Sequence, residues 1–349
     1  MKISEAFCEC CSNFSLIVPE TKDSIETEEI LDYYGIKTPF HIERVKAKDT
    51  QGKWYRYIFA LETIKKIWKN KYDSIITRDP LVAFLCVLLH KRTVLDLHGE
   101  LAHLCGRAYR IIKWDFFRKS KYLKLVMITE SLVKYYEKKY GLNPQLCTVL
   151  PDGCTVENFE EYCNNELFAN AQISIAYAGS FGVGRGYEII EGLAQNLKAY
   201  TYEIYGGTAE DAQKVTGRVP PENIKFNGFV PNRDMPEELC KHDILLLPYQ
   251  STLIAKGEDT GKVMSPLKMF EYMASGRVII ASDSEVLKEI LQDTNCYFAK
   301  ADDLNSWISK VEEVVNNRET AKKKALQAKT DVKAYTWKIR AQKMLRLLC

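Results

Sequence analysis

Short apolar runs alternate with helical patterns throughout the second half of this 349-residue chain, and no other feature constrains the fold as strongly. Each parallel strand needs a crossover before the next one, usually a helix, so the alternation predicts a parallel sheet. Helical patterns fill the intervals, including one that starts at Ser265. We therefore predict a doubly wound α/β domain, with strands at Ile173 to Tyr177, Tyr202 to Tyr205, Ile224 to Phe226, Ile244 to Leu247, Val278 to Ala281 and Tyr297 to Phe298.

The first half has a similar but less regular pattern. A turn-forming trio, Pro151 to Gly153, follows its last apolar run and predicts a domain boundary. We expect one domain over residues 1–151, a second over 152–331 and a C-terminal amphipathic helix within 332–349. The strands expected in the first domain are Phe14 to Val18, Ser74 to Thr77, Thr93 to Leu97, Leu125 to Ile128 and Thr148 to Leu150.

Composition excludes several classes of protein. No apolar run approaches the roughly 18 to 20 residues that a bilayer span needs, and the first residues lack the apolar stretch of a signal peptide. We expect a cytoplasmic protein whose 11 cysteines are free thiols in a reducing compartment. The cluster Cys8, Cys10 and Cys11 has poor spacing for zinc, so buried thiols are the stronger interpretation.

Charge is distributed unevenly along the chain. Residues 1–150 hold 25 Lys and Arg against 18 Asp and Glu, whereas residues 151–349 hold 24 against 28. The first half is therefore basic and the second acidic. A basic half indicates an anionic partner on that side, such as a membrane surface or a lipid phosphate.

The segment from Ser265 to Gly276 is a helix with clear end signals. Ser265 suits the N-cap, Pro266 the first helical position and Gly276 the C-terminal stop. Free backbone N–H groups and the helix dipole make such an N-terminus an anion site. Glu271 lies almost two turns inside, where a carboxylate accepts hydrogen bonds from ribose hydroxyls. An ordinary capped helix with no ligand is the alternative.

This segment and several others resemble family 4 retaining glycosyltransferases, which belong to the glycosyl transferases group 1. The resemblance covers nearly the whole chain and is strongest from 148 to 295. It rests on Ser265 to Asp283, Tyr177 to Ser180 with Arg185 and Gly186, Tyr205 to Gly207, Phe226 to Pro231, Asp243 to Pro248, Val149 to Gly153 and Tyr335 to Trp337.

The resemblance implies a GT-B fold, in which two Rossmann-like domains face a central cleft and a C-terminal helix crosses back to the first domain. It also implies that Arg185 and Lys268 neutralise the donor diphosphate and that Glu271 binds the ribose. The nucleotide-sugar, UDP- or GDP-linked, is then a substrate, and no cofactor is expected. The donor-binding set that follows is Gly182, Arg185, Gly207, Phe229, Val230, Ser265, Pro266, Leu267, Lys268 and Glu271.

Three departures from the family pattern stand out. The first glutamate of the family's pair is replaced by Val263, and the nearby Glu258 and Asp259 are out of register. Ser180-Phe181 stands near the place of a second diphosphate arginine. Ile3 to Cys11 is typical of the helix that follows the first strand, so that strand is missing or reduced to Met1 to Ser4.

His98 follows a clear strand, at the edge of a parallel sheet where α/β folds bind ligands. The resemblance places a histidine here against the donor sugar; a loop histidine with a local hydrogen bond is the alternative. Asp96 is expected to hold the loop. Glu100 is a second candidate on the acceptor side.

A basic, aromatic run from Arg107 to Lys124 includes Arg118, Lys119 and Lys121. A solvated helix face is one interpretation. A contact with an anionic membrane or a lipid-linked acceptor, peripheral at the inner face of the membrane, is the other.

The expected chemistry follows from the same residues. No DxD-type pair stands where a metal would bridge the diphosphate, so a metal-independent hexosyltransferase is expected. Its acceptor would be a saccharide or a lipid-linked sugar in surface polysaccharide or glycoconjugate synthesis, and nucleic acid is not an expected partner. A nucleotide-sugar 2-epimerase of the same fold and a catalytically silent nucleotide-binding partner subunit are the alternatives.

Overall fold

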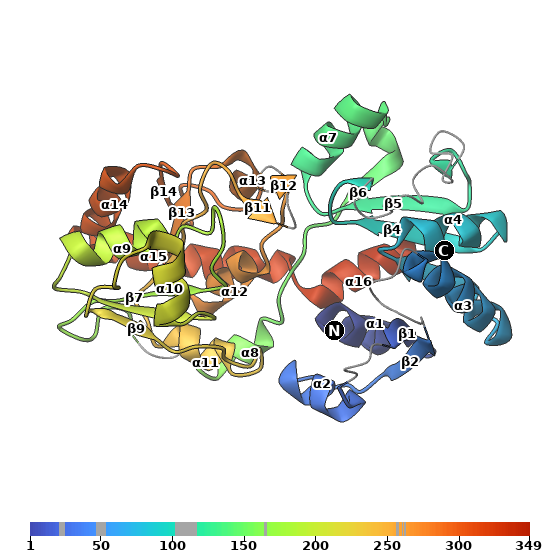
Figure 1. Ribbon diagram of the computed structural model, residues 1–349, viewed down its shortest axis with the longest axis horizontal. Coiled ribbons are helices and arrows are strands. Elements are labelled where there is room, and N and C mark those ends of the chain that lie inside the picture. The colour runs from blue at the N-terminus through green and yellow to red at the C-terminus, as the bar shows by residue number, and fades with distance from the viewer. Residues whose placement is uncertain are drawn as a thin grey trace. The chain divides into compact units, whose positions relative to one another are not determined.

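The computed structural model describes residues 1–20, 25–46, 54–101, 117–163, 166–255, 258–259, 261 and 263–349. The chain forms two compact units (Figure 1). Unit 1 contains Met1–Pro151 together with the C-terminal Trp337–Cys349, and unit 2 contains Asp152–Thr336.

Unit 2 is built on a six-stranded parallel sheet in the order β14-β13-β10-β7-β8-β9. The first three strands in sequence run outward in one direction and the next three in the other, which is the doubly wound Rossmann arrangement. Its strands are β7 (Ser174–Ala178), β8 (Thr201–Tyr205), β9 (Ile224–Phe226), β10 (Ile244–Leu247), β13 (Val278–Ser282) and β14 (Tyr297–Ala299).

Helices cover both faces of this sheet, and alternate residues of each strand explain why. Along β10, Leu245 and Leu247 join one buried cluster while Ile244 and Leu246 join another. Successive strand residues point to opposite faces, so each face buries its own apolar set. The helices of unit 2 are α8 (Glu157–Glu160), α9 (Tyr187–Asn196), α10 (Ala209–Thr216), α11 (Met235–Cys240), α12 (Leu267–Ser275), α13 (Glu285–Lys288), α14 (Leu304–Asn316), α15 (Arg318–Asp331) and the short 3₁₀ helix η3 (Val332–Ala334).

Unit 1 contains a four-stranded parallel sheet in the order β3-β4-β5-β6 and a parallel pair β1-β2. These strands are β1 (Ser15–Glu20), β2 (His41–Lys46), β3 (Ser74–Thr77), β4 (Arg92–Leu97), β5 (Leu123–Met127) and β6 (Cys147–Val149). Its helices are α1 (Lys2–Cys10), α2 (Thr27–Tyr33), α3 (Tyr55–Lys69), α4 (Pro80–Leu88), α7 (Glu130–Tyr140), the 3₁₀ helix η2 (Pro144–Leu146) and α16 (Trp337–Arg346).

The C-terminal helix α16 completes the core of unit 1. Trp337, Ala341 and Met344 are buried in one cluster with Phe7 of α1 and Val94 of β4. Residues from the two ends of the chain thus share a single apolar core.

Two short hairpin strands lie on the segment before α12. They are β11 (Ile254–Ala255) and β12 (Glu258–Asp259), paired antiparallel with Ile254 opposite Asp259. A two-residue pairing of this kind adds a local turn rather than a further strand to the main sheet.

The cysteine predictions are partly wrong. Cys163 and Cys240 form a disulfide, with their Cα atoms 5.2 Å apart, whereas free thiols were expected throughout. Proximity in the fold brings together two residues that sequence spacing does not connect. Cys8, Cys10 and Cys11 are free but only half-buried. Among the described residues, no helix has the length and apolar character needed to cross a membrane.

Candidate donor site

The strand order of unit 2 reverses between β7 and β10, and ligands of doubly wound folds bind outside the carboxyl ends of strands at such a point. Gly179 follows β7 and Tyr249 lies just beyond β10. The hydroxyl of Tyr272, on α12, accepts a hydrogen bond of 2.8 Å from the backbone N–H of Ala178. This bond fixes α12 against the end of β7.

Lys268, in the first turn of α12, is the central side chain of this site. Its residue is 9% exposed, and its Nζ is buried without a hydrogen-bond partner. The Nζ lies 4.0 Å from the centroid of the Tyr177 ring and 4.7 Å from that of Tyr249. A Cβ on Gly179 would lie 3.0 Å from the Nζ, so the backbone approaches closely only because residue 179 is glycine.

The environment of Lys268 disfavours its charge. Burial, reinforced by the positive charge of Arg185, lowers the pKa of Lys268 well below its ordinary value, and Glu271 opposes this only in part. Burying an ammonium group without a hydrogen-bonding anion is costly. An anion placed at the Nζ would supply the missing partner and favour the charged form.

Arg185 lies in a loop shaped by glycines. Gly184 and Gly186 have φ of 80° and 81°, and the Arg185 N–H donates to the Gly182 carbonyl at 3.0 Å. A Cβ on Gly186 would lie 1.7 Å from the Pro248 oxygen. The loop is therefore pressed against the segment after β10, close enough for Arg185 to lower the pKa of Lys268 through its charge.

The start of α12 differs from the sequence prediction. Pro266 is the N-cap, with φ −75° and ψ 117°, and the helix begins at Leu267, so the assignment of Ser265 as N-cap is wrong. Proline lacks an N–H and here adopts the extended conformation that a cap residue needs, which shifts the start by one residue. The cap residue Pro266 offers no side-chain acceptor, and the Met269 N–H already donates to the Pro266 carbonyl at 3.0 Å. The N–H groups of Leu267 and Lys268 are the ones that this helix start presents to a ligand.

The other predicted donor residues belong to the same unit. Glu271 is half-buried on α12, and its charge acts on Lys268. Gly207 packs against the Phe181 ring, which a Cβ would meet at 2.4 Å. Phe229 is 75% exposed, whereas Val230 packs against the buried cluster on the α12 side of the sheet.

In unit 1, His98 is tied to Asp96 at the end of β4. The His98 Nε2 lies 2.9 Å from Asp96 Oδ2. The two carboxylate oxygens also accept bonds of 2.8 and 3.2 Å from the guanidinium of Arg340 on α16, a residue that sequence patterns did not single out. Burial would raise the pKa of Asp96, but His98 and Arg340 outweigh it and hold the pKa well below its usual range.

Glu100 and the basic run lie nearby in the chain but have separate partners. Glu100 is bound by Lys139 and, at 3.0 Å, by the Tyr140 hydroxyl. Arg118 donates to the Gly141 carbonyl at 2.7 Å, while Lys119 and Lys121 are exposed. The part of the run from Arg107 to Phe116 lies outside the described residues.

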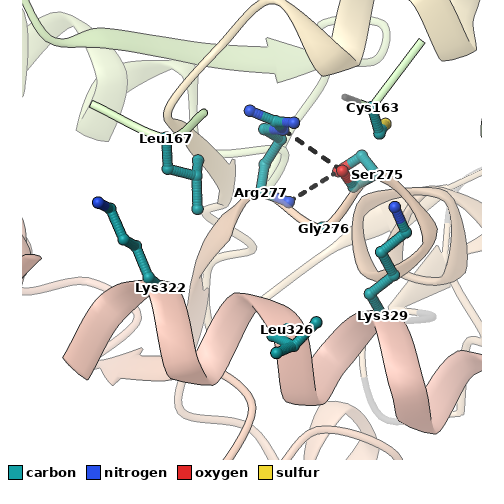
Figure 2. Close-up of a pocket in the computed structure, with 8 residues that line it drawn as sticks. All are labelled: Cys163, Leu167, Ser275, Gly276, Arg277, Lys322, Leu326 and Lys329. Atoms are coloured by element: carbon teal, nitrogen blue, oxygen red, sulfur yellow. Dashed lines mark hydrogen bonds between the residues drawn. The ribbon is translucent and has the colours of Figure 1, made fainter. Parts of the chain in front are cut away.

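A separate cavity of about 210 Å³ lies at the other end of α12 (Figure 2). Figure 2 shows Arg277 hydrogen-bonded to Ser275, with Lys322 and Lys329 rising from α15 on either side of Leu326. Gly276 ends α12 here, eight residues after Lys268, so this cavity is distinct from the candidate donor site. No group of three or more His, Cys, Asp or Glu in the described ranges is arranged to hold a metal ion.

Residues 185–346 match the model of the family described as glycosyl transferase-like. This part of the chain is therefore similar to that family. The resemblance to group 1 glycosyltransferases is thus confirmed.

A protein of Klebsiella pneumoniae, described as an uncharacterized 41.2 kDa protein in cps region, is 22% identical. The match covers 67% of this chain and 66% of that protein, just under two thirds of its length.

Two solved structures are similar over almost the whole chain. A glycosyltransferase from Rickettsia africae has a TM-score of 0.74 at 13% identity and covers 99% of this chain and 93% of its own. HepE of Anabaena, solved with UDP and glucose, has a TM-score of 0.70 at 14% identity, with 95% and 91% covered. The predicted GT-B fold, with two Rossmann-like units, is confirmed.

Proposed function

We propose that the protein is a retaining glycosyltransferase that moves a hexosyl group from a UDP- or GDP-linked sugar to a saccharide or lipid-linked acceptor. The observation that carries this proposal is the buried Lys268 Nζ without a hydrogen-bond partner at the carboxyl ends of β7 and β10. Such a group needs an anion, and the donor diphosphate is the anion that a glycosyltransferase binds at this edge.

Each donor group has a residue suited to it. Lys268, Arg185 and the first N–H groups of α12 neutralise the diphosphate as the sugar leaves, because charge that develops on the departing nucleotide is stabilised by fixed positive groups. Glu271 accepts hydrogen bonds from the ribose hydroxyls. The turn with Phe229 and Val230 borders the base, and His98 faces the donor sugar.

A panel of nucleotides tests the donor site directly. UDP or GDP should raise the thermal midpoint of the protein more than ADP, dTDP or CMP, since a ligand of the native state stabilises it. Lys268→Met should abolish the shift, and Glu271→Ala should reduce it. Lys329→Met, which changes the cavity at the other end of α12, is the matched control and should leave it intact.

Turnover of a radiolabelled donor tests the reaction. Transfer that requires an acceptor supports the proposal, and retention of anomeric configuration in the product supports the retaining mechanism. A changed sugar without acceptor would indicate the 2-epimerase instead, while binding without turnover would indicate a silent partner subunit.

Independence from metal is part of the proposal, because Lys268 and Arg185 already supply two cationic side chains beside the diphosphate. Transfer should continue after dialysis against EDTA. Loss of activity that Mg²⁺ or Mn²⁺ restores would contradict this part alone.

On the acceptor side, we propose that Glu100 contributes to the acceptor site and that Arg118, Lys119 and Lys121 contact anionic lipid at the inner face of the membrane, where surface polysaccharide is assembled from cytoplasmic donors. The exposure of Lys119 and Lys121 supports this. The protein should sediment with anionic vesicles at low salt, and Arg118→Ser/Lys119→Ser/Lys121→Ser should weaken that binding.

A further inference from the structure

Three large apolar side chains form an exposed line along α3. Trp54, just before the helix, is 71% exposed, Leu61 is 55% exposed and Trp68 is 70% exposed. They are spaced by seven residues, close to two helical turns, so they lie on one side of the helix. The line from Trp54 to Trp68 is about 21 Å long at 1.5 Å per residue.

A different face of α3 packs against the rest of unit 1. Ala60, Thr63 and Ile67 are the buried residues of this helix. At 100° per residue, the mean direction of these three side chains around the helix axis is roughly a third of a turn from the direction of the Leu61 side chain. The exposed line is therefore not needed for the packing of α3, and large apolar side chains gathered on one exposed side of a helix are typical of an interaction site.

Charge around the line indicates the partner. The helix α3 carries four cations and one acid, Glu62, but one of these cations, Lys66, pairs with Glu43 of β2. Lys65 and Lys69 are exposed on its solvent side, and Glu62 pairs with Lys65. Unit 1 also holds the basic half of the chain. An anionic surface complements this distribution.

We propose that the line of Trp54, Leu61 and Trp68, with Lys65 and Lys69 beside it, is a docking surface for an anionic lipid bilayer. Indole rings favour the boundary between headgroups and acyl chains, and lysine stems let the ammonium group reach the headgroups. A helix that presents a straight apolar line flanked by cations lies in the plane of the interface. This surface goes beyond the transfer reaction and is separate from the basic run at Arg118 to Lys121.

Vesicle sedimentation of the full chain tests the surface. The protein should bind phosphatidylcholine vesicles that contain phosphatidylglycerol, and Trp54→Ser/Leu61→Ser/Trp68→Ser should weaken binding at least tenfold. The three side chains are exposed, so the variant should keep the circular dichroism spectrum of the parent. Val219→Ser/Leu326→Ser removes two equally exposed apolar side chains of unit 2, at 78% and 65% exposure, and should change nothing.

Fluorescence locates the contact. Brominated lipid should quench tryptophan emission on binding, and Trp54→Phe and Trp68→Phe should each reduce the quenched fraction. Trp307→Phe removes a fully buried indole of unit 2. In this variant, the fraction of the remaining tryptophan emission that is quenched should be equal to that of the parent protein or larger.

Several results would overturn the proposal. These are failure of the parent protein to bind anionic vesicles, equal binding by the triple serine variant, and loss of binding only in Arg118→Ser/Lys119→Ser/Lys121→Ser. A concentration-dependent dimer that the α3 variant abolishes would also overturn it in favour of a second copy. None of these measurements uses a sugar donor, so failure here and failure of the proposed transfer reaction are distinguishable.

Discussion

Among single residues, Lys268 has the environment with the clearest chemical consequence. Two tyrosine rings and the close backbone at Gly179 surround its Nζ, and no acceptor neutralises it. The surrounding titratable and charged groups are Tyr177, Tyr249, Tyr272, Arg185 and Glu271. Because burial and Arg185 lower the pKa of Lys268, the amine is neutral over part of the range in which other lysines are charged.

We therefore predict that UDP binding takes up a proton. The bound diphosphate raises the pKa of Lys268 again, so the affinity falls as pH rises above the pKa of the empty site, by up to tenfold per pH unit. Calorimetric titrations in buffers with different ionisation enthalpies measure the uptake. Lys268→Arg, always charged, should bind without it, and identical enthalpies in all buffers would contradict the prediction.

The buried environment of Asp96 leads to a second prediction about a single residue. Its carboxylate holds Arg340 of α16 and His98 together, and it is 3% exposed. Arg340→Met leaves this buried charge with only His98 and the more distant Arg78, so unit 1 should lose about 3–5 kcal/mol of stability. Urea unfolding measures the loss. Arg340→Met/Asp96→Asn, in which the charge is removed too, should recover part of it; a double variant no more stable than Arg340→Met would be evidence against the ion pair.

The ion pair between Asp96 and Arg340 also makes the free energy of unfolding depend on pH. The pKa of Asp96 is lower in the folded protein than in the unfolded chain, so its contribution is fully present above the ordinary carboxyl pKa of about 4. That contribution is lost as pH falls toward the folded value. The parent protein should therefore lose stability below about pH 4 more steeply than Arg340→Met/Asp96→Asn.

Among the elements, the loop before α9 contains a glycine, Gly186, whose steric role can be tested, and Gly217 is a matched control for it. Gly186 and Gly217 both have positive φ, of 81° and 71°, but a Cβ on Gly186 meets the Pro248 oxygen while one on Gly217 meets nothing within 4 Å. Gly217→Ala should cost about 1–2 kcal/mol, the strain of the left-handed conformation alone. Gly186→Ala should cost more and weaken UDP binding through Arg185. Equal losses in the two variants would rule out the steric argument.

The sequence predicted elements best where a strand is buried on both faces. Ile244 to Leu247 is a continuous apolar run and was found as β10. The strand β2 was missed because His41–Lys46 contains only two apolar residues, Ile42 and Val45, which are three positions apart and do not follow the period of a strand. The cap at Ser265 was misplaced because proline at position 266 suits both the N-cap and the first helical turn. Local sequence signals locate an element, but they define its first and last residues only to within one or two positions.

Across the whole molecule, what the sequence could not predict is contact between distant residues. Arg340 and Asp96 are separated by 244 positions, and Cys163 and Cys240 by 77, so no local pattern connects them. Lys268 and Arg185 are candidate site residues that their motifs predict, whereas the aromatic faces of Tyr177 and Tyr249 around Lys268 became apparent only in the folded structure. The return of α16 to the core of unit 1 is also a long-range contact, but the family resemblance predicted it, and the structure confirms it.

Two units with separate cores lead to the last prediction. The candidate donor residues Arg185, Lys268 and Glu271 all belong to unit 2. Calorimetry of the full chain should therefore show two transitions, of which UDP raises only one. At a UDP concentration about 100 times Kd, the stabilisation is roughly 2.7 kcal/mol, equivalent to about 5–10 °C for a unit of this size.

Variants already described assign the two transitions. Arg340→Met weakens a contact within unit 1 and should lower the transition that UDP leaves in place, while Lys268→Met should abolish the response of the other. If the nucleotide raised both transitions equally, its binding energy would be distributed over both units. In that case the donor would be held by unit 1 residues such as His98 as strongly as by the end of α12, and the assignment of nucleotide binding to unit 2 alone would be wrong.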